Sequence, residues 1–207
     1  SMFAYAREIL SPGMMEIEFA GLLEAFLRTR GHQGLVRVRS FNNEVFYGHI
    51  MSGTNLAVPS CSVGPTGGPG PNASMPQGAG TRVIGINEPI QVDYVGSHKG
   101  YIVDQARTFF IGEAGDEFLK IHDLALEIQQ AIIEQGKAGV TAGSLYETAI
   151  NMASESGCLD GFMGHPQSVP FIGHGIGLEL DELPIIGKKS SQLLEESMVI
   201  ALEPKFI

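Results

Sequence analysis

The chain has 207 residues, of which 43% are hydrophobic and 17% charged, proportions that are ordinary for a folded domain and exclude a disordered chain. Its formal net charge of -10 argues against nucleic acid and anionic membranes as partners, because both are bound mainly through Lys and Arg. Two cysteines make no disulfide framework, and no apolar run is long enough to span a membrane. With no basic leader either, we expect a cytoplasmic location.

The first predicted element is a helix over residues 12–30, where apolar residues recur at helical spacing. We expect Ser11 to cap the start of this helix and Gly31 to cap its end. Residues 35–58 then place apolar side chains among polar alternates, a pattern that indicates strands.

A segment rich in glycine and proline follows at residues 62–80, and this composition excludes a helix or a central strand. It is either a flexible linker or an ordered loop beside a cleft. We favour the ordered loop, because periodic strands resume directly after it. Residues 89–110 indicate two such strands around a turn at residues 96–100.

Two amphipathic helices are predicted in the second half, over residues 117–135 and 142–156, each followed by a glycine. Glycine-punctuated strands follow, and the chain stops within the apolar run 198–207, so we expect the native protein to continue beyond it. Because helices do not alternate singly with strands, the order of elements predicts an α+β domain with an antiparallel sheet.

Two aspartates flank the predicted turn. If the turn is centred between His98 and Lys99, Asp93 and Asp104 face each other, with Cβ atoms about 4.5–5.5 Å apart. Two such carboxylates in an apolar hairpin repel each other, so they need a shared proton, a cation or a metal. On spacing alone, a surface hairpin with both aspartates solvated is the alternative.

His174 stands among three glycines in residues 173–177, which let the backbone approach a neighbour closely and leave the imidazole free to project. A hydrogen-bonded core histidine is the alternative for such a lone residue. Glu203 ends an apolar strand just before Pro204. Together with the aspartates, these side chains form a carboxylate-rich set that suits manganese and also accommodates cobalt, iron or zinc. Several carboxylates per imidazole indicate two ions rather than one.

These motifs resemble those of the pita-bread metallopeptidases, the superfamily of methionine aminopeptidase and prolidase. The similar residues are Asp93 and Asp104 with Arg107-Thr108-Phe109, then Gly173-His174-Gly175-Ile176-Gly177, then Glu203-Pro204. The similarity is nearest to the prolidase and aminopeptidase P branch and extends over nearly the whole chain. We therefore expect residues 2–207 to form one catalytic domain that lacks its last strand or strands.

The resemblance implies a pita-bread fold, in which a curved antiparallel sheet carries helices on its outer face. It also implies that Asp93, Asp104, His174 and Glu203 bind two divalent ions, such as Mn, Co or Zn. Glu203 would also be catalytic, as the acceptor of the proton from the attacking water. The implied activity is that of an aminopeptidase or Xaa-Pro dipeptidase, which hydrolyses short peptides through a hydroxide held by the two metals. Relatives of this type are commonly homodimers.

Three departures from the family pattern bear on activity. Gln77 stands where the family has a histidine that contacts substrate, and Asp181 replaces another histidine, so we place both at substrate-binding positions. Each loss could lower the rate about 10²–10⁴-fold. The fifth family ligand, a glutamate, would lie beyond Ile207. A weakened or inactive domain that binds peptides or proteins, and a metal-free hydrolase resembling creatinase, therefore remain alternatives.

Overall fold

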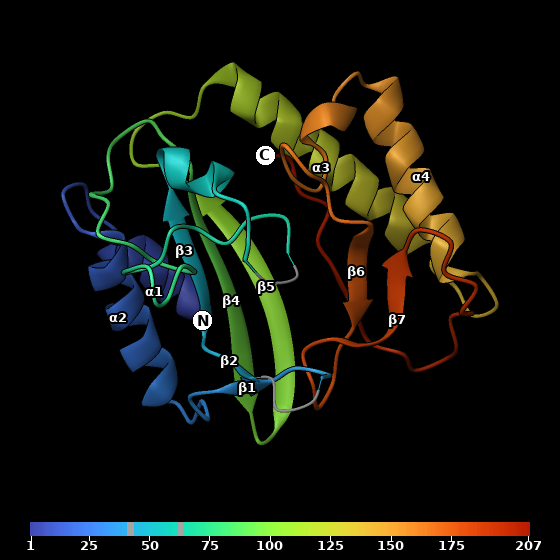
Figure 1. Cartoon of the computed structure of the whole chain (residues 1–207), viewed down its shortest axis with the longest axis horizontal. Coiled ribbons are helices and arrows are strands. Elements are labelled where there is room, and N and C mark those ends of the chain that lie inside the picture. Colours follow the sequence, from blue (N-terminus) through green and yellow to red (C-terminus); the bar gives the residue numbers. More distant parts are fainter. Residues whose placement is uncertain (41–43, 62–63) are drawn as a thin grey trace.

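The computed structural model describes residues 1–40, 44–61 and 64–207, which form two halves lying side by side (Figure 1). The first half contains α1 (Met2–Ile9), α2 (Glu16–Arg28), β1 (Val36–Arg37), β2 (Glu44–Val45), β3 (Gly48–Ser52), the 3-10 helix η1 (Gly53–Ala57), β4 (Ile90–His98) and β5 (Tyr101–Phe109). The second half contains α3 (Asp116–Gln135), α4 (Ala142–Glu155), the 3-10 helix η2 (Leu159–Gly161), β6 (Phe171–Gly175), β7 (Glu182–Gly187) and β8 (Ile200–Leu202).

Each half pairs helices with an antiparallel sheet. The sheet order is β3-β4-β5 in the first half and β7-β6-β8 in the second, and β1 pairs with β2. The helices α1 and α2 lie on one side of the molecule, against the first sheet, and α3 and α4 accompany the second (Figure 1). This arrangement confirms the predicted α+β class with antiparallel sheets.

The first helix region differs from the prediction. A helix that the sequence analysis did not predict, α1, comes first, and α2 begins at Glu16 instead of residue 12. Gly13 separates the two helices with a φ of 92°, a conformation that disfavours helix continuation. The N-cap of α2 is Met15 and not Ser11, and the Met15 amide donates to the Glu18 carboxylate at 2.8 Å. The C-cap of α2 is Thr29 and not Gly31, which lies three residues after Arg28 with a φ of 95°.

The region predicted as strands over residues 35–58 contains β1, β2 and β3, but its end forms η1 instead of a strand. Its residues 41–43 lie outside the described residues, as do residues 62–63 of the segment rich in glycine and proline. The described part of that segment, residues 64–80, contains no helix or named strand. It is ordered by hydrogen bonds to the body of the domain, such as those from the Thr66 hydroxyl to the Leu56 and Val58 carbonyls at 2.6 and 3.0 Å.

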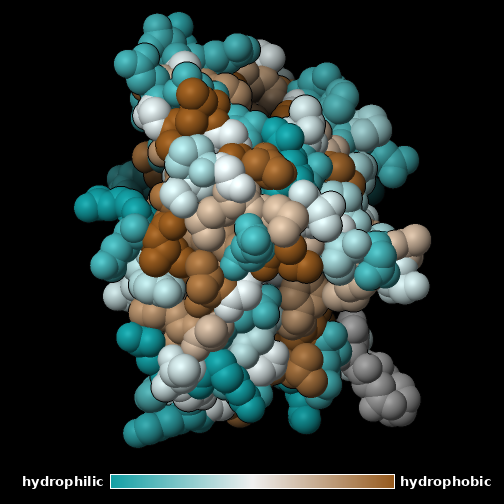
Figure 2. Space-filling model, turned by 90° about the vertical axis from the view of Figure 1, so that its left-hand side faces the viewer, coloured by the Kyte–Doolittle hydropathy of each residue, from teal (hydrophilic) through white to brown (hydrophobic). Residues whose placement is uncertain are grey.

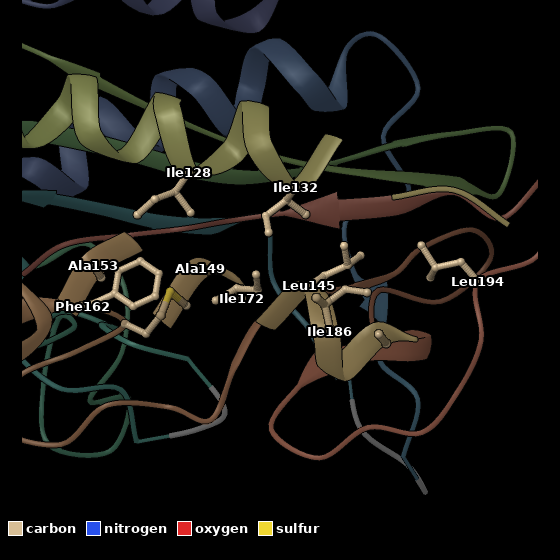
Figure 3. Close-up of a cluster of buried hydrophobic side chains, with 11 residues drawn as sticks. Ile128, Ile132, Leu145, Ala149, Ala153, Phe162, Ile172, Ile186 and Leu194 are labelled. Carbon is tan, nitrogen blue, oxygen red and sulfur yellow. The ribbon is translucent and has the colours of Figure 1, made fainter. Parts of the chain in front are cut away.

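The second half follows the prediction closely in its helices. Both α3 and α4 begin and end within one residue of the predicted limits. Their buried faces pack on β6 and β7 in one apolar core, part of which Figure 3 shows: Ile128, Ile132, Leu145, Ala149, Ala153, Phe162, Ile172, Ile186 and Leu194. The predicted strand 198–207 is only β8, because Pro204 has no amide hydrogen with which to continue the pairing.

The two halves meet through a small apolar cluster. Val95 of β4 and Ile102 of β5 pack there with Val36 and Ile176, and the Ile102 amide donates to the Gly177 carbonyl at 2.8 Å. This contact places the hairpin of β4 and β5 beside the loop after β6. The polar residues singled out in the sequence lie at this junction.

The outer face of α1 and α2 is turned toward the viewer in Figure 2, where apolar side chains gather among polar ones. Ile17 and Leu22 of α2 contribute exposed apolar surface, with 38% and 42% of their area accessible. Among the described residues, no helix is both long enough and apolar enough to cross a membrane.

Candidate metal centre

The turn between β4 and β5 sets the positions of the two aspartates. Lys99 and Gly100 form a two-residue turn with φ values of 53° and 87°, so His98 pairs with Tyr101. As a result Asp93 opposes Ala106, and Asp104 opposes Val95. The prediction that the two aspartates face each other directly is wrong, because the pairing is shifted by two residues, from 104 to 106 opposite Asp93. They are diagonal neighbours on one face of the hairpin, because side chains two residues apart share a face.

His174 sits on β6 between two glycines that the packing requires. A Cβ atom on Gly173 would lie 2.3 Å from the Ala201 carbonyl oxygen, and one on Gly175 would lie 2.4 Å from the Leu183 carbonyl oxygen. The neighbouring strands therefore approach β6 more closely than any side chain would allow. The imidazole of His174 is buried, and its Nδ1 lies 2.9 Å from the Gly175 carbonyl oxygen.

The Nε2 atom of His174 faces three carboxylates from separate parts of the chain. It lies 3.5 Å from Glu203 Oε1 and 3.7 Å from Asp104 Oδ2. Asp181 Oδ1 is 4.0 Å away. These separations exceed a normal hydrogen bond. The structure thus brings the predicted ligands from β5, β6 and the residue after β8 to one place.

Asp93 has a different neighbour, which the sequence analysis did not consider. The Nζ atom of Lys205 donates a hydrogen bond to Asp93 Oδ2 at 2.7 Å, and only 9% of the lysine side chain is exposed. A signal was available in the sequence: Lys205 is the basic residue in the largely apolar run 198–207, two residues after Glu203. Such a lysine is rarely buried without a counter-ion.

The buried charges shift each other's pKa values. Burial by itself would raise the pKa of Asp93, but the ammonium of Lys205 beside it lowers that pKa below its usual value. Burial alone would lower the pKa of Lys205, and the carboxylates of Asp93 and Glu203 reverse this and raise it. The two side chains are therefore a stable ion pair at neutral pH.

The carboxylates around His174 have raised pKa values, in contrast to Asp93. Burial raises the pKa of Asp104, and it raises the pKa of Glu203 to about 7. Burial also opposes the charged form of His174, but the carboxylates of Asp104 and Glu203 raise the pKa of the imidazole to about 9. Burial raises the pKa of Asp181 as well. A cation at this place would relieve the crowding of negative charge.

Gln77 lies against a second histidine that the sequence analysis missed. Its Nε2 is 2.7 Å from Nε2 of His49, and the Cys61 thiol donates to Gln77 Oε1 at 3.5 Å. His49 is the direct cross-strand partner of Asp93 in the pairing of β3 with β4. Burial lowers the pKa of His49, against the influence of the Asp93 carboxylate. Gln77 is thus connected to the edge of the cluster through an imidazole.

The side chains can be tested for their fit to a divalent ion. Two atoms bound to one ion at about 2.1 Å each lie at most about 4.2 Å apart, and the separations of 3.5 and 3.7 Å from His174 Nε2 to Glu203 and Asp104 are within this limit. The Gly175 carbonyl can hold the proton on Nδ1 and leave Nε2 free to bind. In the described ranges, however, no group of three or more His, Cys, Asp or Glu side chains forms a ready-made metal cage. The donor chemistry fits, and the side chains must draw together around the ion.

Comparison with known proteins gives the family. The sequence profile of metallopeptidase family M24 matches residues 1–207, and the chain belongs to this family. The Xaa-Pro dipeptidase of Lactobacillus delbrueckii subsp. lactis is 34% identical over 136 residues, which are 65% of this chain and 35% of that protein. The uncharacterized peptidase YqhT of Bacillus subtilis is 26% identical over 203 residues, or 98% of this chain and 48% of that protein. The chain thus spans about a third to a half of these relatives.

Solved structures share the fold. An X-Pro aminopeptidase from Thermotoga maritima superposes with a TM-score of 0.78 at 30% identity, over 98% of this chain and 48% of that one. A prolidase from Pyrococcus furiosus gives a TM-score of 0.78 at 26% identity, over 98% and 51% of the two chains. These neighbours confirm the pita-bread fold that the motifs predicted. Membership of a metallopeptidase family also implies divalent metal cofactors.

Proposed function

We propose that this chain is the catalytic part of a divalent-metal-dependent exopeptidase that cleaves short peptides at Xaa-Pro bonds. The observation that carries the proposal is the meeting of His174 Nε2 with the carboxylates of Glu203 and Asp104, at 3.5 and 3.7 Å, at the junction of the two sheets. The similarity to an Xaa-Pro dipeptidase and to an X-Pro aminopeptidase supports the choice of substrate.

Asp104, His174 and Glu203 would hold the metal, for which manganese, cobalt and zinc have suitable ligand preferences. A divalent ion, when bound, would supply a water of lowered pKa and would polarise the peptide carbonyl. Glu203 accepts the proton from the attacking water and passes it to the leaving amine. Asp181 and Gln77 contact the peptide from the edge of the cluster.

Hydrolysis of Xaa-Pro dipeptides tests the proposal. The protein is stripped of metal with chelator, reloaded with Mn²⁺ and assayed by release of free proline. We expect turnover that chelator abolishes, and a kcat about 10²–10⁴-fold lower for Glu203→Gln. Glu195→Gln, at an exposed glutamate outside the cluster, is the matched control and should keep full activity. Absence of hydrolysis by the reloaded protein would contradict the proposal.

A second candidate function is binding of peptides without cleavage. The ion pair of Lys205 with Asp93 favours it, because a predicted ligand is already engaged. Fluorescence titration with a labelled Xaa-Pro peptide distinguishes the two candidates. Saturable binding without any proline release over hours, with Mn²⁺ present, would support the binding module over the enzyme.

A further inference from the structure

Lys205 is a buried cation placed where the sequence predicts metal ligands. Its side chain is only 9% exposed, and its Nζ lies 2.7 Å from Asp93 Oδ2. Burying a charged lysine costs hydration free energy, so a nearby negative charge must compensate it. The carboxylate that compensates it is Asp93.

One carboxylate oxygen of Asp93 is therefore already engaged, and this disfavours a second ion at Asp93. Its Oδ2 accepts a charge-assisted hydrogen bond from the ammonium, and such bonds are about twice as strong as neutral ones. An ion drawn to this carboxylate would either displace the ammonium, leaving a buried lysine without a partner, or lie next to a like charge. Both outcomes are unfavourable in a buried site.

The remaining donors suffice for one ion. Asp104 and Glu203 face Nε2 of His174 at separations compatible with a shared ion, and their side chains are largely buried, with 19% and 25% exposed. Asp181 lies slightly farther out, at 4.0 Å. This group contains one imidazole and at least two carboxylates, as many protein ligands as a catalytic ion commonly has.

We propose that Lys205 is a built-in cation that pairs with Asp93, so that the site holds a single divalent ion, bound by Asp104, His174 and Glu203. This inference rests on the proposed function, since it concerns the same metal site. It replaces the two ions that the family resemblance implies with one ion and one ammonium group. Asp93 then acts as the counter-ion of Lys205 and is not a ligand.

Metal counting on the whole chain tests the inference. The protein is stripped with chelator, reloaded with Mn²⁺ and dialysed, and metal per chain is measured by plasma mass spectrometry and the dissociation constant by calorimetry. We expect one ion per chain. The double variant Asp93→Asn with Lys205→Met removes both charges together, and it should keep one ion with an affinity within about threefold of the parent. His174→Ala should weaken binding at least about 10–100-fold, the range known even for indirect partners of a metal.

Single variants at Lys205 sharpen the test. Lys205→Met frees the Asp93 carboxylate, so Mn²⁺ should bind at least about tenfold more tightly or in a second equivalent. Lys205→Arg keeps the positive charge and should bind one ion with the parental affinity. Circular dichroism and melting curves establish that each variant is folded.

Three results would overturn the inference: two ions or none in the parent protein, a loss of affinity beyond about tenfold in the double variant, or unchanged binding in Lys205→Met. The proposed function fails separately. One bound ion with no peptide cleavage would contradict the peptidase and leave the role of Lys205 standing. Two bound ions with cleavage would support the peptidase and contradict the role proposed for Lys205.

Discussion

At the residue scale, two of the side chains that shape the site are ones that motif analysis passed over. Lys205 and His49 belong to no ligand pattern, yet the first pairs with Asp93 and the second holds Gln77. The register of β3 with β4 places His49 opposite Asp93, and 37 residues separate these strands in the sequence. The spacing of residues in the sequence does not predict how two strands pair when so long a segment connects them.

The contact between His49 and Gln77 predicts an effect on substrate binding. If the imidazole orients the amide toward the peptide, His49→Phe should raise the KM for an Xaa-Pro dipeptide about tenfold, the equivalent of one well-placed hydrogen bond. Steady-state kinetics measures it. Gln77→Ala should have an equal effect, and the double variant should show no further increase, because the two residues act as one unit. Additive effects of the two substitutions would contradict this account.

The raised pKa of His174 predicts how the metal-free protein responds to pH. The imidazole titrates near 6.5 in the unfolded chain and at about 9 in the fold. A raised pKa of this kind stabilises the fold fully below pH 6.5, and the stabilisation is lost as the pH rises through 9. With chelator present, we expect the free energy of unfolding to fall by on the order of 2 kcal/mol over this window.

Ionisation of Glu203 also lowers the free energy of unfolding as the pH rises, but over a lower pH range. Its pKa is raised from 4.5 to about 7, so the ionised form destabilises the fold increasingly between these values. Urea unfolding at a series of pH values is the measurement. His174→Gln should flatten the curve above pH 6.5, and a curve that keeps its full slope in this variant would contradict the assignment.

At the scale of elements, the hairpin of β4 and β5 shows what sequence could and could not give. The alternation of side chains fixed which face each aspartate occupies, and the structure keeps Asp93 and Asp104 on one face. The exact pairing depended on the turn type. The tight turn at Lys99-Gly100 moved the partner of Asp93 to Ala106. The helix α1 escaped prediction because it has only eight residues and is stabilised by packing of Ala6 into the core.

The buried carboxylate of Glu16 ties α2 to two other segments. It accepts hydrogen bonds from the Ser52 amide and hydroxyl at 2.6 and 2.7 Å, from Asn55 at 2.9 Å and from the Gly80 amide at 3.1 Å. The ordered loop that carries Gln77 is thereby anchored to the helix. These four hydrogen bonds, the Glu16 clamp, hold α2, the end of β3 with η1, and the loop together.

Removal of the Glu16 clamp should therefore be costly. We expect Glu16→Ala to lower the free energy of unfolding by about 3 kcal/mol, because buried donors lose a charged acceptor. Glu16→Gln keeps the shape and one acceptor oxygen and should cost less. Urea unfolding followed by circular dichroism gives both values, with Glu8→Ala at an exposed position as the control. A loss below about 0.5 kcal/mol for Glu16→Ala, the usual range of surface changes, would show that the clamp is unimportant.

At the scale of the whole molecule, the order of elements was sufficient to predict the α+β class, and the motifs were sufficient to predict the pita-bread fold. What the sequence could not give is the meeting of the two sheets, since the small cluster around Val95, Ile102 and Ile176 depends on long-range packing. That junction decides which ligands converge. It brings Asp104, His174 and Glu203 together and leaves Asp93 to Lys205.

The homodimer suggested by the resemblance stays a prediction. The exposed apolar surface of α2 (Figure 2) is a region that association could cover, and it includes Leu22 at 42% exposure. Light scattering at high protein concentration should give the mass of a dimer, and Leu22→Glu should shift it toward a monomer if this face is used. A monomeric mass for the parent protein at all concentrations would contradict the prediction.

The position of a bound ion tests the central claim most directly. A crystal of the protein soaked in Mn²⁺ gives an anomalous difference map at the manganese absorption edge. We predict one peak, within bonding distance of Asp104, His174 Nε2 and Glu203, with Lys205 still paired to Asp93. No peak at this place, or a peak bound to Asp93 with the lysine displaced, would contradict the account.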